Sequence, residues 1–198
     1  MRARSRLASV LGVVAALTTG CGASTPVTLA GNPDRDLLRQ DQLPSPDFTI
    51  YQGVGPTGAG WLDPGGAAVI AGDGFGSAAQ VEYYRPIAFE ESNGPITLTA
   101  TAARFRAPQG AAAALTAIET ALDARPGAIR LATGRVGDGG DAIGVGGTVD
   151  GIQAIEIVLV WRVDNVIDSL DADGRLGGLQ LGQLLPLATI QTADEGGG

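Results

Sequence analysis

The sequence predicts an α+β domain in which helices flank an antiparallel sheet. Apolar and polar residues alternate along 95–105, a pattern typical of a half-buried strand. An alanine-rich segment follows at 109–124, with apolar residues at helical spacing. The long apolar run 152–163 is joined by the turn Asp164-Asn165 to a returning strand at 166–170. Because tight turns join neighbouring strands, we expect one antiparallel sheet with helices packed on it.

The remaining elements follow from composition and turn signals. We expect strands at 48–51, 79–89, 129–132 and 142–145, helices at 67–71 and 179–193, and loops at 53–60, 92–94 and 137–141. Asp63-Pro64 has the composition of a cap for the first short helix. Pro86 either ends its strand or places that strand at the sheet edge. Pro186 predicts a kink or restart in the last helix.

The first twenty residues have the layout of a signal peptide. Three arginines precede an apolar run from 7 to 17, and small residues follow directly before Cys21. The apolar run is shorter than the roughly 20 residues that span a bilayer. We therefore expect residues 1–20 to be removed on export.

Cys21 is the single cysteine of the chain, and it follows that signal directly. The segment 17–21 resembles the lipobox of bacterial lipoproteins. The resemblance implies that Cys21 becomes the first residue and carries lipid with at least two acyl chains, such as palmitate. Two chains anchor a protein stably, whereas one chain binds marginally. The expected location is therefore the extracytoplasmic face of the cell membrane, with no cysteine left for a disulfide.

The segment 21–32 is small and polar, which predicts a flexible tether before a single domain at 33–198. Removing three of the 13 basic residues leaves ten against 21 acidic ones, a net charge near −11. Binding of nucleic acid, or of anionic lipid by the domain itself, requires basic patches that this composition disfavours.

Motif spacing and composition point to no metal and no cofactor. The chain has no histidine, which excludes Ser-His-Asp and Cys-His sites and makes zinc improbable. Residues 53–58 fit GxGxxG, but the dinucleotide fingerprint needs a helix opening there, so a loop is favoured. Residues 169–176 partly match a calcium loop, but Ser169 and Gln180 would stand where carboxylates are needed. A polar turn between strand and helix is the preferred interpretation.

Two groups of side chains remain as candidates for function. Paired carboxylates could support glycosidase chemistry, and the candidates are Glu82, Glu90, Glu91 and Glu156. Aromatic residues favour pockets, and the candidate ligand-binding residues are Trp61, Tyr83, Tyr84 and Trp161. Tyr83 and Tyr84 are neighbours on a predicted strand, so they should face opposite sides, one buried and one exposed. Trp161 ends an apolar strand and is expected in the core.

Three segments, 105–122, 136–138 and 158–167, together resemble a group of small actinobacterial-type lipoproteins and extracellular sensor-like domains. Their shared pattern is a strand ending in phenylalanine, an alanine-rich helix, a glycine-aspartate turn and a hairpin with arginine before its turn. The resemblance covers roughly 79–193 and implies a sheet flanked by helices, similar to the PsbP fold. It implies no catalytic residue.

The leading hypothesis is a lipid-anchored envelope lipoprotein whose non-catalytic domain binds a small ligand or a partner protein. The membrane contact would run through the lipid on Cys21. Two alternatives stay open: a carboxylate-dependent envelope hydrolase, and a structural spacer. Convergence of two carboxylates in one cleft would favour the hydrolase, and absence of a pocket of about 300 Å³ would favour the spacer.

Overall fold

The computed structural model describes residues 30–195. The expected signal peptide, Cys21 and nearly all of the expected tether lie outside the described residues. Among the residues that are described, no helix is long and apolar enough to cross a membrane.

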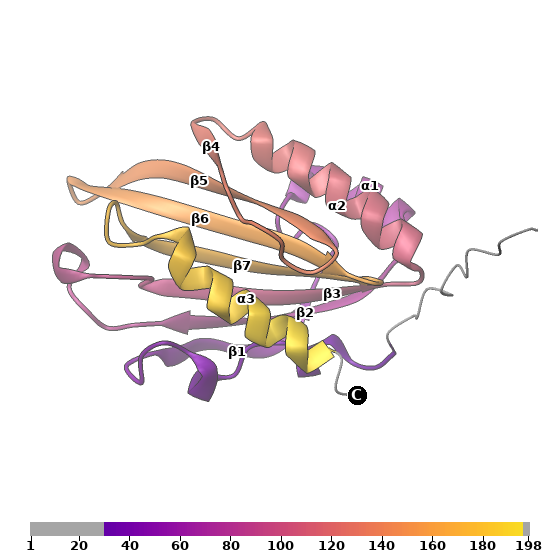
Figure 1. The fold of residues 1–198 in the computed structure, drawn as a ribbon, viewed down its shortest axis with the longest axis horizontal. Helices are drawn as coiled ribbons and strands as arrows, with labels where there is room; N and C mark the ends of the chain where they lie inside the picture. Colours follow the sequence, from indigo (N-terminus) through magenta and orange to yellow (C-terminus); the bar gives the residue numbers. More distant parts are fainter. Residues whose placement is uncertain (1–29, 196–198) are drawn as a thin grey trace, which may run out of the picture.

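Seven strands form one antiparallel sheet (Figure 1). They are β1 (Thr49–Thr57), β2 (Phe75–Tyr84), β3 (Thr97–Phe105), β4 (Ala128–Leu131), β5 (Gly139–Val149), β6 (Ile152–Val163) and β7 (Val166–Arg175). Their order in the sheet is β1-β2-β3-β7-β6-β5-β4. Strands β1 to β3 form one side of the sheet in chain order. The chain then crosses to the opposite edge at β4, and β5, β6 and β7 follow in order until β7 pairs with β3. The α+β prediction is therefore confirmed.

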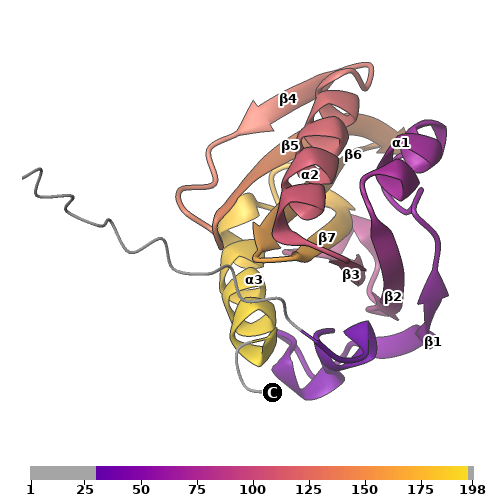
Figure 2. The same cartoon turned by 90° about the vertical axis from the view of Figure 1, so that its right-hand side faces the viewer.

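Helices cover both faces of this sheet. They are α1 (Ala67–Gly72), α2 (Pro108–Asp123) and α3 (Leu181–Glu195), with short 3-10 turns η1 (Pro33–Arg35), η2 (Gln40–Gln42), η3 (Pro64–Gly66) and η4 (Phe89–Glu91). Figure 2 shows α1 and α2 on one side of the sheet and α3 on the other. Each side has its own buried apolar cluster. The sheet thus has an α2 face and an α3 face.

Helix α2 follows the sequence pattern closely. It begins at Pro108, whose missing N–H costs nothing in a first turn. The four residues predicted to share one face are all buried: Ala111, Leu115, Ile118 and Leu122. This stripe attaches α2 to the sheet.

Helix α3 continues through Pro186, so the restart alternative is wrong, whereas the kink stays a prediction. Proline removes the hydrogen bond to the carbonyl four residues earlier, here that of Gly182 in the first turn. Burial of Leu184, Leu187 and Ala188 against the sheet holds the helix in place. Tertiary packing therefore outweighs the local preference.

Strand β1 runs through residues that were expected to form a loop. Residues Gly55, Pro56 and Thr57 pair with Gln80, Ala79 and Ala78 of β2. The pairing is interrupted by register shifts on both sides of Gln52. A proline is tolerated because β1 is an edge strand whose outer side needs no ladder bond. The loop prediction for 53–57 is wrong, and no helix opens within the GxGxxG pattern.

Strand β7 extends to Arg175, so the interpretation of 169–176 as a polar turn is wrong. Residues 166–173 pair with β3, and residues 166–175 pair with β6. Alternate side chains consequently point to opposite faces, which is incompatible with a calcium loop that converges its ligands on one point. Within 30–195 there is no group of three or more residues suited to hold a metal.

Two further strands have boundaries that differ from the predicted ones. Strand β2 ends at Tyr84, before Pro86, and lies between β1 and β3, so the edge alternative is wrong. Strand β5 begins at Gly139, inside the expected loop 137–141. Gly140 is required there because a Cβ would lie 2.3 Å from the carbonyl oxygen of Val160.

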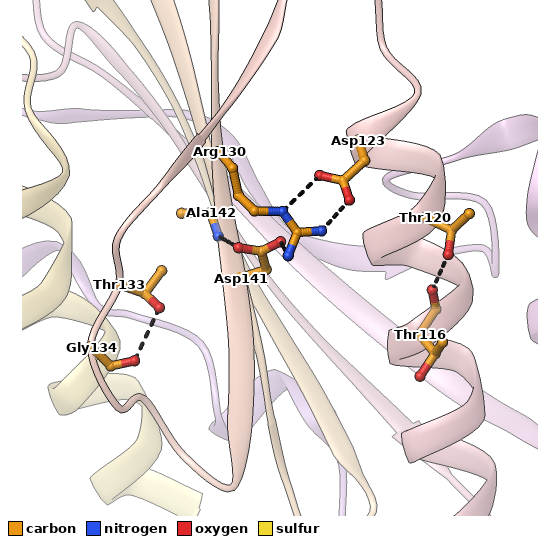
Figure 3. Close-up of polar contacts among 8 residues, drawn as sticks. All are labelled: Thr116, Thr120, Asp123, Arg130, Thr133, Gly134, Asp141 and Ala142. Carbon is orange, nitrogen blue, oxygen red and sulfur yellow. Dashed lines mark hydrogen bonds and ion pairs between the residues drawn. The ribbon is translucent and has the colours of Figure 1, made fainter.

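Arg130 on the edge strand β4 ties this side of the molecule together (Figure 3). Its guanidinium pairs with Asp123 at the end of α2. Its Nη1 lies 2.9 Å from Asp141 Oδ2 on β5. Asp141 in turn accepts a hydrogen bond from the N–H of Ala142 at 2.9 Å. The C-terminal end of α2 is thereby held over the sheet.

Candidate ligand-binding face

The α2 face of the sheet has an apolar half and a polar half. The helices cover the apolar half, whose sheet residues include Ala103, Phe105, Val158, Val160 and Ile167. The other half is polar, and we call it the polar half-face: Glu82, Thr97, Thr99, Glu156, Asp171 and Asp173. All six side chains keep some exposed surface.

Strand register brings these six residues together. Glu82 lies opposite Thr99, and Thr99 lies opposite Asp171. In the next row, Thr97 lies opposite Asp173, and Asp173 lies opposite Glu156. Paired residues on neighbouring strands point to the same face. Asp171 also pairs with Val158 of the α2 core, which fixes the face on which the group lies.

Four carboxylates thus share one surface. Glu156 and Asp173 are directly opposite, with Cβ atoms about 5 Å apart in such pairs. Glu82 and Asp171 are two strands apart, about 10 Å. Two of the predicted candidates, Glu82 and Glu156, therefore share this surface three strands apart, whereas Glu90 and Glu91 lie exposed in η4.

Asp171 is the most perturbed group of the polar half-face. Burial against the sheet raises the pKa of its carboxyl to about 7, and the negative charges of Glu156 and Asp173 add to the effect. Arg125 opposes the shift without cancelling it. Within the described residues, the Asp171 side chain takes part in no hydrogen bond or ion pair. A carboxyl in this position is desolvated and lacks a counter-charge.

Asp173 has a different environment. Thr97 Oγ1 donates a hydrogen bond to Asp173 Oδ2 at 2.9 Å. Burial still raises the pKa of Asp173, while the Thr97 hydrogen bond lowers it and Glu156 raises it. Asp173 is the more exposed of the two aspartates.

Among the described residues, Arg125 is the cation whose charge acts on Asp171, and it is already paired. Arg125, just after α2, places Nη1 2.6 Å from Glu156 Oε1. Its Nη2 donates to the carbonyl of Leu62 at 3.0 Å. The guanidinium therefore connects the end of α2, the segment around Leu62 and β6. It leaves the charge of Asp171 uncompensated.

Two of the four predicted aromatics border the polar half-face. Trp61 Nε1 donates to Ser169 Oγ at 3.2 Å, two residues before Asp171 on the same side of β7. Its ring stacks on Phe75. Tyr84 is opposite Thr97 in the row of Asp173 and is 38% exposed. Trp61 and Tyr84 thus lie at opposite ends of the group.

The other two aromatics belong to the α3-face core. Tyr83 is 2% exposed, and its hydroxyl donates to the carbonyl of Leu38 at 2.6 Å. Trp161 is fully buried, and its Nε1 donates to Thr192 Oγ1 at 2.9 Å. The opposite orientation of Tyr83 and Tyr84 is confirmed, as is the core position of Trp161.

Sequence reasoning passed over Asp171 and Asp173 as part of a turn. The signal that could have identified them is the period of two, with Leu170 and Ala172 on one side of the strand and the aspartates on the other.

A separate surface depression of about 420 Å³ lies elsewhere, bordered by the exposed residues Gln40, Asp41 and Pro46.

Comparison with known proteins identifies a fold and no family. The chain matches no known family model and no curated protein. The crystal structure of the extracellular domain of PknH from Mycobacterium tuberculosis is similar, with a TM-score of 0.52 and 11% identity. The match covers 87% of this chain and 98% of that one. A structure from Bacteroides thetaiotaomicron gives a TM-score of 0.38 at 12% identity, covering 71% of this chain and 39% of the other.

Proposed function

We propose that this protein is a lipid-anchored, extracytoplasmic binding protein whose polar half-face holds a small ligand with an ammonium or guanidinium group. Asp171 carries the proposal, because a desolvated carboxyl without a counter-charge is stabilised by a cation. Perturbed carboxyls of this kind concentrate at functional sites.

The cellular location rests on the amino-terminal sequence. A signal-like segment followed by Cys21 supports export and lipid attachment. The fold shared with an extracellular domain, that of PknH, is in keeping with such a location. The negative charge of the domain would hold it away from an anionic membrane surface.

The nature of the ligand follows from the charges on the polar half-face. Four carboxylates face one arginine, Arg125, which is bound to Glu156. An added cation between Asp171 and Asp173 would offset their mutual repulsion and favour the ionised form of Asp171. Trp61 and Tyr84 at the two ends supply aromatic surface that attracts cations.

Calorimetric titration of the full chain in detergent micelles tests this function, with spermidine and arginine amide as probes. Because Asp171 with a pKa of about 7 is half protonated at pH 7, cation binding should release about half a proton per complex. Measuring the heat in buffers of different ionisation enthalpy gives that number. Asp171→Asn should abolish the proton release and weaken binding at least tenfold.

Asp41→Asn is the matched control, since it removes an exposed carboxylate of η2, which contacts α3 on the other face of the sheet. It should leave affinity and proton release unchanged. The proposal fails if neither probe binds, or if Asp171→Asn binds both probes as the unsubstituted chain does.

A carboxylate-dependent hydrolase is the second candidate, and Asp171 also favours it. A carboxyl with a pKa of about 7 beside other carboxylates could act as a general acid. Its diagonal neighbour Glu156 would stand about 7–8 Å away between Cα atoms, close enough for the two carboxyl groups to reach the separations of glycosidase pairs. Release of reducing sugar from peptidoglycan, abolished by both Asp171→Asn and Glu156→Gln, would establish this candidate over simple binding.

A further inference from the structure

A second polar site lies on the α3 face, beside the first turn of α3. It is a cleft of about 110 Å³, lined by Ser45, Arg85, Asn93, Gly94, Gln183 and two prolines. Pockets for drug-sized molecules begin at roughly 300 Å³. This cleft can therefore hold one small functional group.

Arg85 brings an unneutralised positive charge to the cleft. Its guanidinium carbon lies 5.8 Å from the ring centroid of Phe48, a core residue of the α3 face. Among the described residues Arg85 forms no ion pair, in contrast to Arg104 or Arg125. Its Nε is buried without a hydrogen bond, and Nη2 reaches the carbonyl of Asn93 only at 3.5 Å. The guanidinium is positioned, but its Nε has no acceptor among the described residues.

Gln183 adds a second donor, which has no acceptor in the part of the chain that the structure describes. Its Oε1 accepts a hydrogen bond from the backbone N–H of Gln180 at 2.9 Å. That bond fixes the orientation of the amide, so the other end of the group is the NH2. Nε2 stands beside Gly94, where a Cβ would lie 3.5 Å from it. Gln183 belongs to the first turn of α3, where the helix dipole favours negative charge.

We propose that this cleft binds a carboxylate or phosphate oxyanion of a small ligand through Arg85 and Gln183. Charge-assisted bonds from a guanidinium to such oxyanions are among the strongest polar contacts in proteins. The nearby Ser45 hydroxyl is not available, since it donates to Asp47 Oδ2 at 3.0 Å. The site is separate from the polar half-face, so neither proposal depends on the other.

Nuclear magnetic resonance of the full chain in detergent micelles tests the cleft. Sodium acetate and inorganic phosphate are titrated separately, with sodium chloride at matched ionic strength as reference. We expect saturable shifts of the Arg85 Nε–H, the Gln183 side-chain amide and the Gly94 N–H with at least one of the two oxyanions. Stronger binding of acetate would identify a carboxylate ligand, and stronger binding of phosphate a phosphoryl ligand.

Variants separate a built site from a weak surface effect. Gln183→Glu keeps an acceptor for the Gln180 N–H but replaces the NH2 with a negative charge, so binding should weaken at least tenfold. Arg85→Lys keeps the charge and loses the planar fork, so it should bind with intermediate affinity. Gln180→Ala retains the backbone N–H and is the control, expected to bind normally.

Three results would overturn the proposal. They are the absence of saturable shifts with both oxyanions, identical shifts with chloride, and unchanged affinity in Gln183→Glu. Retention of the dispersed backbone spectrum in each variant shows that the comparison is made between folded chains.

Discussion

Arg125 and Glu156 form an ion pair of 2.6 Å that joins the end of α2 to strand β6. Both side chains are about 30% exposed, so solvent weakens the attraction. The pair nevertheless affects Asp171, because Arg125, the cation that acts on its carboxyl, is already bound to Glu156.

Arg125→Gln removes this cation from the polar half-face. We expect the pKa of Asp171 to rise further, because Arg125 lowers it at present. The free energy of unfolding should fall by about 1 kcal/mol. Carboxyl carbon resonances across a pH series measure the first effect, and thermal unfolding measures the second. Asp41→Asn, which removes a largely exposed partner of Arg39, should have little effect on either.

Asp171→Asn should change how stability depends on pH. The folded pKa of about 7 is above the unfolded value of about 3.9, so the folded state holds the proton more tightly. Stability from this residue is therefore full below pH 4 and is lost as pH rises to 7 and above. The loss is at most about 4 kcal/mol.

Denaturant unfolding at pH 4.5 and pH 8 measures this effect. At pH 8 the Asp171→Asn variant should be more stable than the unsubstituted chain. Its free energy of unfolding should also differ less between pH 4.5 and pH 8. Equal pH dependence in the variant and the unsubstituted chain would contradict the environment assigned to Asp171.

Asp36→Ala should be strongly destabilising. Asp36 Oδ2 lies 2.5 Å from Arg104 Nη2, and the two residues are 3% and 8% exposed. Removing the carboxylate leaves a buried arginine without its partner, which costs about 3–5 kcal/mol. The double variant Asp36→Leu/Arg104→Met should recover most of that loss. Chemical denaturation distinguishes the two, and equal stability of single and double variants would contradict this account.

Gly140→Ala should destabilise the β5–β6 pairing, whereas Gly139→Ala should not. A Cβ at Gly140 would lie 2.3 Å from the Val160 carbonyl oxygen, but one at Gly139 would meet nothing within 4 Å. We expect a melting temperature several degrees lower for the first variant, in line with overpacking costs of about 1–3 kcal/mol. Equal melting temperatures of the two variants would contradict this prediction, because they would show that the backbone shifts to accommodate a Cβ at position 140.

The sequence alone predicted the elements whose signals are local. The alternation in β3, the alanine-rich helix α2 and the hairpin of β6 and β7 all follow from periodicity within a single segment. The predicted strand at 48–51 is shorter than β1 because Gly53, Gly55 and Pro56 disfavour strands. For Pro56 the edge position of β1 removes the cost of the missing N–H. The predicted strand at 166–170 ends before β7 does, because Asp171-Ala172-Asp173-Gly174 has the composition of a turn.

The candidate site required information that no single segment contains. Glu82 and Glu156 are candidate carboxylates from the sequence, but their position on one face with Asp171 depends on register across β2, β3, β7 and β6. The pairing of β7 with β3 joins segments about seventy residues apart. The lipid on Cys21 and the likeness to the PsbP fold stay predictions.

The most direct test of the binding site is the titration of the Asp171 carboxyl carbon by nuclear magnetic resonance, with and without saturating spermidine. We predict an apparent pKa of about 7 in the free protein, and a lower value, by on the order of one pH unit, in the complex. An ordinary aspartate pKa in the free protein, or a value that spermidine leaves unchanged, would contradict the proposed cation site.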